Sequence, residues 1–157
     1  MPIDEALFKL AMSHFASGVT IVTTEHAETP YGMTVASFAS LSLHPPLVLI
    51  CVEKTVKTHD AIVAAEKFGV NILAQEQTEV SGRFASKKIE DRFAGVAWSR
   101  GELGMPLIDG AICALECRVH SQLPGGDHTI FVGEVVSART SEAKPLVYFR
   151  SGYRELA

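Results

Sequence analysis

The stretch Val19-Thr20-Ile21-Val22-Thr23-Thr24 consists entirely of β-branched residues. Such side chains favour an extended backbone, so this stretch predicts a strand. On its N-terminal side, Asp4 can cap a helix that begins at Glu5, and Gly18 stands where a C-terminal helix cap is expected. The first part of the chain is therefore predicted to be one amphipathic helix followed directly by a strand.

Beyond this strand, extended segments follow one another with few helices between them. Polar residues at Glu25–Pro30 predict a turn. The strand expected after this turn ends before the Pro45-Pro46 pair. The expected strands are Met33–Leu41, Leu47–Val52, Phe68–Leu73, Ile112–Ser121, Thr129–Ala138 and Leu146–Arg150, and the expected helices are Thr58–Phe68, capped by Thr58 or Asp60, and Gln75–Ala85. Residues 86–109 read as irregular. Strands in runs exclude the βαβα alternation of a doubly wound sheet and favour a closed or nearly closed antiparallel barrel with peripheral helices.

Length and composition bound the class of protein. The 157 residues, 47% hydrophobic and 20% charged, predict a single domain over residues 1–157 with a packed core. The net charge of −4, with scattered lysines and arginines, predicts no nucleic-acid face. The apolar run Leu47–Val52 is too short to cross a membrane, and the acidic N-terminus lacks the layout of a signal peptide. We therefore expect a cytoplasmic protein without membrane partners.

Cysteines and common catalytic motifs point to no familiar chemistry. The odd set Cys51, Cys113 and Cys117 argues against a disulfide framework, and the last two have no zinc-site spacing. The sequence lacks G-x-G-x-x-G after a strand, a P-loop, H-E-x-x-H and G-x-S-x-G. We predict inert, buried thiols and no metal site.

Four short segments could bind a ligand, and each also has an ordinary structural interpretation. Gly32–Ser40 carries small and hydroxyl residues: it is either a solvated edge strand or accessible backbone against which a flat ligand lies. Glu53–His59 is either a capped, solvated loop or a phosphate site at a helix start. Arg83 is either an exposed side chain or a second cationic contact. His128 is either a hydrogen-bonded loop residue or a reactive group oriented by Asp127.

In order along the chain, these segments and their neighbours resemble the flavin reductase-like family, the short flavin:NAD(P)H reductases that are small components of two-component flavin monooxygenases. The matching stretches are His14–Thr24, Gly32–Phe38, Leu41–Leu49, Phe68–Leu73, Arg83–Ala85, Asp91–Phe93, Gly126–Val135 and Pro145–Phe149. They cover essentially the whole chain, and the ordered set is far more specific than any single motif.

The resemblance implies a mainly β fold, a split β-barrel of the FMN-binding type with peripheral helices, working as a homodimer with flavin near the subunit interface. It implies hydride transfer from NADH or NADPH to FMN or FAD, and delivery of reduced flavin to a partner monooxygenase. It places His128 on the nicotinamide side as the catalytic residue. The implied flavin-binding residues are Met33, Thr34, Val35, Ala36, Ser37, Cys51, Val52, Lys57, Thr58, His59, Arg83, Phe84, Ala85 and Tyr153.

One departure and two alternatives accompany this interpretation. The family often ends in Gly-x-Tyr-His, whereas this chain has Gly152-Tyr153-Arg154, which bears on the nicotinamide contacts. A flavin-binding or electron-relay module on the same barrel would bind flavin without oxidising NAD(P)H. An enzyme like pyridoxamine phosphate oxidase would need clustered phosphate-binding arginines, which the sequence lacks.

Overall fold

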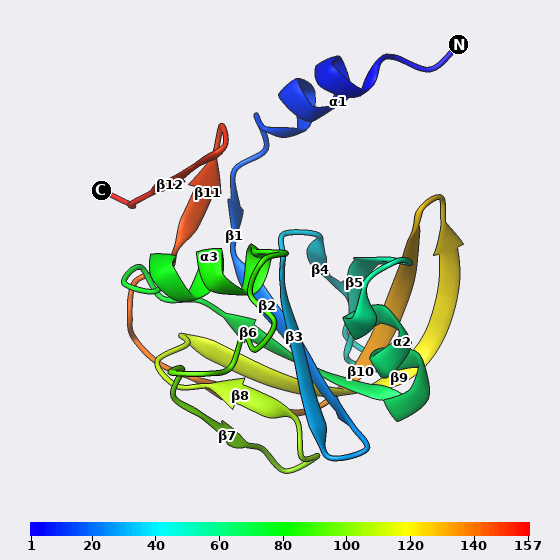
Figure 1. The fold of residues 1–157 in the computed structure, drawn as a ribbon, viewed down its shortest axis with the longest axis vertical. Helices are drawn as coiled ribbons and strands as arrows, with labels where there is room; N and C mark the ends of the chain where they lie inside the picture. Colours follow the sequence, from blue (N-terminus) through cyan, green and yellow to red (C-terminus); the bar gives the residue numbers. More distant parts are fainter.

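Three helices and twelve strands make up the computed structural model, which describes all residues 1–157 (Figure 1). The helices are α1 (Glu5–Met12), α2 (Lys57–Ala65) and α3 (Thr78–Ala85). The strands are β1 (Ser17–Gly18), β2 (Thr20–His26), β3 (Thr29–Val35), β4 (Phe38–Ser42), β5 (Leu47–Glu53), β6 (Lys67–Ile72), β7 (Trp98–Arg100), β8 (Pro106–Ile108), β9 (Cys113–Gly125), β10 (His128–Thr140), β11 (Val147–Phe149) and β12 (Gly152–Arg154). The expected mainly β class with few helices is confirmed.

Seven strands form one antiparallel sheet in the order β3-β2-β6-β9-β10-β5-β4. Its two edge strands, β3 and β4, are consecutive in the chain and are joined by Ala36 and Ser37 alone. The three Cα–Cα steps from Val35 to Phe38 span at most about 11 Å. The sheet must therefore curl until its two edges approach each other at this connection.

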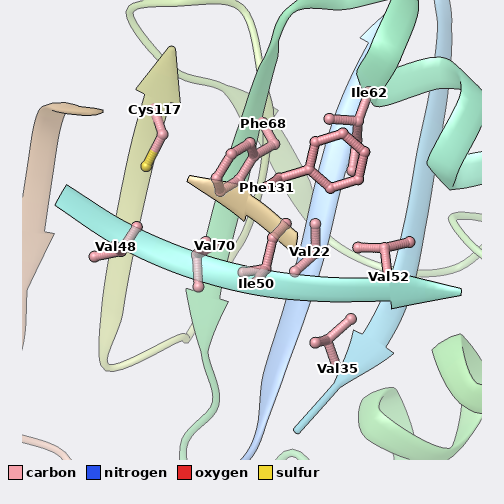
Figure 2. Packing of buried hydrophobic residues seen from close by; sticks show 10 residues of the cluster. All are labelled: Val22, Val35, Val48, Ile50, Val52, Ile62, Phe68, Val70, Cys117 and Phe131. Carbon is pink, nitrogen blue, oxygen red and sulfur yellow. The ribbon is translucent and has the colours of Figure 1, made fainter. Parts of the chain in front are cut away.

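The curl encloses the larger of two apolar clusters. Figure 2 shows its ten residues pointing toward one another from six strands and α2. They are Val22, Val35, Val48, Ile50, Val52, Ile62, Phe68, Val70, Cys117 and Phe131. A second cluster includes Phe84 of α3 and Ile21 of β2, so α3 covers one side of the sheet as α2 covers another. The two helices are thereby fixed on either side of β3.

The first helix is predicted correctly at its start and wrongly at its end. Asp4 caps α1, its Oδ1 accepting a hydrogen bond from the Leu7 N–H at 2.8 Å. Gly18 is not the C-terminal cap: Ser13 holds that position. Gly18 lies in β1, because the chain leaves the helix early to pair with β11.

Two further expectations in the first half of the chain are wrong. The expected strand Met33–Leu41 is divided into β3 and β4 at Ala36–Ser37, where the chain crosses from one sheet edge to the other. Neither Thr58 nor Asp60 caps α2: Val56 holds the N-cap position without a side-chain cap, and Thr58 is the second residue of the helix, with its side chain buried.

The hairpins are tighter and more numerous than expected. The β2–β3 turn is only Ala27 and Glu28, both with positive φ (50° and 65°), and the β9–β10 turn is Gly126 and Asp127. Residues 86–109 contain the small β7–β8 ladder, and β12 extends the predicted last strand into a hairpin. The His44–Pro45 peptide bond is cis. None of the helices has both the length and the apolar character needed to cross a lipid bilayer.

Candidate functional site

The Met33–Ser37 segment lies where the two edges of the sheet meet. As an edge strand, β3 leaves one row of backbone N–H and C=O groups unpaired by the sheet. Met33 and Thr34 are half-buried, while Ala36 and Ser37 are exposed. The Ser37 carbonyl accepts a hydrogen bond from the Cys51 N–H at 3.1 Å, which holds the segment against β5. The result is accessible backbone next to small side chains.

The strand register brings His128 to this region. β10 pairs with β5 so that His128 lies opposite Glu53 and Thr129 opposite Val52. The Lys54 N–H donates to the Asp127 carbonyl at 3.0 Å, which extends the pairing past the end of β5. His128, the first residue of β10, and the end of β5 are therefore neighbours, although more than 70 residues separate them.

Asp127 and His128 form a hydrogen-bonded pair. His128 Nδ1 lies 2.7 Å from Asp127 Oδ1, and this contact lowers the pKa of the Asp127 carboxyl. A carboxylate only accepts hydrogen bonds, so Nδ1 carries the proton and Nε2 is the ring nitrogen left for a ligand. About 40% of the His128 side chain is exposed.

The start of α2 presents one free cation and one inward-facing histidine. The Lys57 side chain is exposed, whereas Thr58 is buried. His59 Nδ1 lies 2.9 Å from Asp60 Oδ1, and its Nε2 lies 2.7 Å from Thr129 Oγ1. Both ring nitrogens of His59 thus have protein partners, and this residue joins α2 to β10.

On the other side of β3, α3 and the C-terminal hairpin meet. Thr34 Oγ1 donates to the Ser81 carbonyl at 2.6 Å, and Ser81 Oγ lies 2.8 Å from the Tyr153 hydroxyl. Ser81 is only 1% exposed, whereas Tyr153 is partly exposed. Hydrogen bonds therefore link Tyr153 of β12 to β3 through one residue of α3.

The predicted segment Arg83–Ala85 offers little free side chain. The Arg83 guanidinium donates to the backbone carbonyls of Asp91 and Arg92, at 2.7 and 2.8 Å. Phe84 is fully buried, its ring 5.0 Å from that of Phe93. Only Ala85 is exposed. This segment packs against β3 on the side of α3, and it can contact a ligand mainly through Ala85 and backbone atoms.

Comparison with known proteins places the chain in a family. The family described as "Flavin reductase like domain" matches residues 12–157. The chain belongs to this flavin reductase-like family.

Its relatives include reductases of several named systems. The reductase subunit HsaB of a flavin-dependent monooxygenase of Mycobacterium tuberculosis is 42% identical over 154 residues, covering 96% of this chain and 82% of that protein. The NADH-dependent FAD reductase of Streptomyces globisporus is 42% identical over 155 residues, covering 96% and 85%. The solved structure of the S. globisporus C-1027 NADH:FAD oxidoreductase SgcE6 with NAD and FAD fragments is 40% identical, with a TM-score of 0.94, covering 98% and 93%.

Three residues of this flavin reductase-like domain that organise the site escaped the sequence analysis as individual site residues. Ser81 gave no signal, because its partner Tyr153 is 72 positions away. Arg92 donates to the Gly32 carbonyl at 2.8 Å and thereby braces β3. Thr129 lies inside the Gly126–Val135 stretch, where its neighbour His128 drew attention instead.

The thiols of the flavin reductase-like domain are free, and burial suppresses their ionisation. Burial raises the pKa of the half-buried Cys51 and Cys113 thiols. Burial, helped by the charge of Glu116, raises the pKa of Cys117 to about 12. No group of three or more His, Cys, Asp or Glu side chains is placed to hold a metal ion.

Proposed function

We propose that this chain is an NAD(P)H:flavin oxidoreductase, in which NAD(P)H and a proton reduce FMN or FAD and leave NAD(P)⁺. The observation that carries the proposal is the uncovered Met33–Ser37 edge, with the exposed Lys57 on the α2 side and His128 beside β5. Nucleophile and metal chemistry are not needed for this reaction, because the two cofactors supply the reactive atoms. The relatives named as NADH:FAD oxidoreductases support this assignment.

The residues at the edge fit a flavin. The backbone groups that the sheet leaves unpaired in Met33–Ser37 can bond the polar edge of a flat ring, although the carbonyls of Val35, Ala36 and Ser37 already accept hydrogen bonds within the protein. The small Ala36 and Ser37 leave room for the ring. Cys51 of β5 lies beside this edge, whereas the side chain of Val52 is buried in the core, so Val52 is proposed to contribute through its backbone alone. The exposed Lys57 with the start of α2 suits a phosphate.

The remaining predicted residues are proposed to surround and support the flavin site. Thr58 is proposed to act through its backbone and His59 as a brace, since neither presents a free side chain. Arg83, Phe84 and Ala85 are proposed to support, through α3, the part of the site that holds the flavin ring. Tyr153 of β12 is proposed to cover the same part of the site.

His128 is proposed to hold the nicotinamide against the bound flavin. When bound, the flavin accepts the hydride of the nicotinamide. Hydride transfer needs the reacting atoms about 3–3.5 Å apart, so the protein's contribution is orientation and exclusion of water. The Asp127 contact fixes the His128 ring with Nε2 outward, as a hydrogen-bonding group for the nicotinamide side.

The test follows absorbance at 340 nm with purified protein, NADH or NADPH, and FMN or FAD. We expect oxidation of at least one nucleotide well above the protein-free rate. No oxidation above that blank in any of the four combinations overturns the proposal. Tight flavin binding without oxidation would instead identify the flavin-binding or electron-relay module.

We further propose that the curled sheet is a split barrel of the FMN-binding type and that the chain is a homodimer. Figure 1 shows α1 standing away from the sheet, and no residue of this helix is buried. Seven large apolar side chains are each at least half exposed: Leu7, Phe8, Leu10, Met12, Phe15, Leu41 and Leu43. A monomer seldom exposes so many, and a second copy of the chain would cover them.

Light scattering after size-exclusion chromatography tests the dimer. We expect twice the monomer mass of 16.9 kDa for the wild type and a shift toward the monomer for Leu10→Glu. A monomeric wild type overturns the proposal.

We also propose that reduced flavin passes to a flavin-dependent monooxygenase in the cytoplasm, as the HsaB and 4-nitrophenol monooxygenase reductase relatives suggest by their names.

A further inference from the structure

A cavity of about 440 Å³ lies beside α3, and its volume is within the range of small-molecule sites, about 300–1,000 Å³. Glu79, Val80 and Arg83 of α3 line it. At 3.6 residues per turn, these three residues cover one side of the helix. Ser81, whose carbonyl accepts the Thr34 hydroxyl of β3, lies on the opposite side. The helix therefore separates this cavity from the sheet edge on which flavin is proposed to lie.

The floor of the cavity is apolar and belongs to the folded core. Val80, Val96 and Ile108 contribute to the lining. Ile108 is a member of the second apolar cluster and is only 2% exposed, and the two valines pack against the same cluster. In Figure 1, α3 and the strand β8 that carries Ile108 lie on the same side of β3. A ligand in the cavity would therefore rest its apolar part on side chains that the fold already fixes.

Two carboxylates line the same cavity, those of Glu79 and Asp109. Both residues are exposed, and neither takes part in an ion pair. The backbone of Asp109 is held on both sides. Its N–H donates to the Ala97 carbonyl at 3.0 Å, and its carbonyl accepts a hydrogen bond from Gln77 Nε2 at 3.0 Å. Asp109 is thereby fixed beside α3, which reduces the entropy lost when its carboxylate binds a ligand.

The charge of the lining favours a cation. Its one basic residue, Arg83, already donates through Nε and Nη2 to the backbone carbonyls of Arg92 and Asp91, at 2.8 and 2.7 Å. Two carboxylates and one guanidinium leave one negative charge in excess. A single ammonium group balances this charge and donates N–H bonds to carboxylate oxygens. The lining has no histidine or cysteine, and no group of three potential metal ligands is present, so an organic cation suits it better than a metal ion.

We infer that this cavity binds a small organic amine with one positive charge. The carboxylates of Glu79 and Asp109 hold its ammonium group, and its apolar body lies on the floor formed by the valines and Ile108. This binding site lies apart from the proposed flavin site and does not depend on the proposed function.

Titration of the ¹⁵N-labelled protein with benzylamine at pH 7, followed by amide shifts in NMR spectra, tests the inference. The probe is an ammonium at this pH, and benzyl alcohol is an uncharged probe of nearly the same shape. We expect saturable shifts around the cavity, at the amides of Val96, Ala97 and Asp109, and weaker binding of the alcohol. Equal affinities for the two probes, or shifts that do not saturate, overturn the inference.

Substitutions of the two carboxylates test the charge. Glu79→Gln and Asp109→Asn should each weaken the binding of benzylamine about threefold to fivefold, as expected for the loss of one exposed ion pair. The double variant should bind the amine no better than the alcohol. Glu76→Gln is the matched control, because Glu76 is exposed, lies outside the cavity and loses the same charge. If Glu76→Gln weakens binding as much, the amine responds only to the net charge of the protein and the inference is wrong.

Ala97→Leu tests the cavity itself without a change of charge. Ala97 is exposed and lines the cavity, so the longer side chain occupies space that the amine needs. We expect benzylamine binding to be lost while the thermal melting temperature stays that of wild type. Undiminished binding in a folded Ala97→Leu overturns the inference. No flavin is present in these titrations, so a failure of the proposed function is visible separately, as no reduction of either flavin.

Discussion

The side chains of His59 and Thr129 are hydrogen-bonded across 2.7 Å, although 70 positions separate them in the chain. Because His59 Nδ1 donates to Asp60, its Nε2 accepts a hydrogen bond from the Thr129 hydroxyl. The bond joins the start of α2, the proposed phosphate end of the site, to the residue that follows His128, at the proposed nicotinamide end. The two ends therefore keep a fixed separation.

Removing the Thr129 hydroxyl tests this connection. Thr129→Val keeps the shape and the strand preference but leaves Nε2 of the partly buried His59 unpaired, which costs about 1–3 kcal/mol of unfolding free energy. We also expect a several-fold rise in the flavin Kd. Urea unfolding and flavin titration measure both, and Thr129→Ser should behave as wild type. Wild-type values for Thr129→Val would show that the bond holds nothing in place.

Because His128 is proposed to contact the nicotinamide, substitutions in the Asp127–His128 pair should change the kinetics with NADH and leave flavin binding unchanged. His128→Ala should lower kcat/KM for NADH by about tenfold or more, because orientation of the donor is lost, while the flavin Kd stays unchanged. Asp127→Asn should show a smaller loss in the same direction. Initial rates at saturating flavin, together with flavin titration, provide the measurement. An unchanged NADH rate in His128→Ala would refute the role given to this residue.

The pH dependence of the same pair follows from its charges. The hydrogen bond from His128 lowers the pKa of Asp127 in the folded protein, so the contact stabilises the fold above the ordinary aspartate pKa of 3.8. The contribution is lost as pH falls through the lowered folded pKa. In Asp127→Asn the acid limb of the stability curve should therefore be less steep than in wild type. Thermal melts from pH 6 to 3 measure this, and coincident limbs would contradict it.

Local chemistry made much of the fold predictable from sequence. The β-branched run Val19–Thr24 supplies the first five residues of β2, Thr20–Thr24, and Asp4 caps α1, because both effects act within a few residues. The break between β3 and β4 was missed. It is imposed by which edges of the sheet meet, and no preference of Ala36 or Ser37 announces it.

The site residues likewise divide into those whose contacts are local in the sequence and those whose contacts depend on the tertiary fold. The Asp127–His128 contact joins neighbours in sequence, so Asp127 could be named in advance as the residue that orients the ring. Ser81 could not, because it acquires its role only when β12 folds back over α3. The resemblance implied that Phe84 contacts flavin, whereas its side chain is fully buried against Phe93.

The Ser81–Tyr153 bond predicts an energetic coupling between α3 and the C-terminal hairpin. Tyr153→Phe and Ser81→Ala should each destabilise the fold, and the double variant should lose less than their sum, with a coupling energy of about 0.5–1.5 kcal/mol. Denaturant unfolding of the four proteins gives this value. Strict additivity would mean that the hydroxyls do not interact in solution.

Cys117 predicts a loss of stability at alkaline pH. Its pKa is raised by burial from an ordinary 9.0 to about 12, so between these values the unfolded chain releases a proton that the folded chain keeps. The unfolding free energy should then fall by up to about 1.4 kcal/mol per pH unit above pH 9. Cys117→Ala, though less stable at neutral pH, should show a shallower alkaline limb. Parallel limbs for both proteins would contradict the assignment.

The absence of a side chain at Gly32 allows β3 to pack closely against Phe84 of α3. A Cβ at this position would lie 2.7 Å from Phe84 Cε1 and 3.1 Å from Phe93 Cζ, so Gly32→Ala must displace the strand or the rings. We expect a loss of about 1–3 kcal/mol of unfolding free energy and weaker flavin binding, because Met33–Ser37 moves with the strand. Gly18→Ala, with no atom within 4 Å of the new Cβ, is the matched control and should leave both unchanged. Equal effects of the two substitutions in urea unfolding and flavin titration would show that close packing at Gly32 does not position the edge.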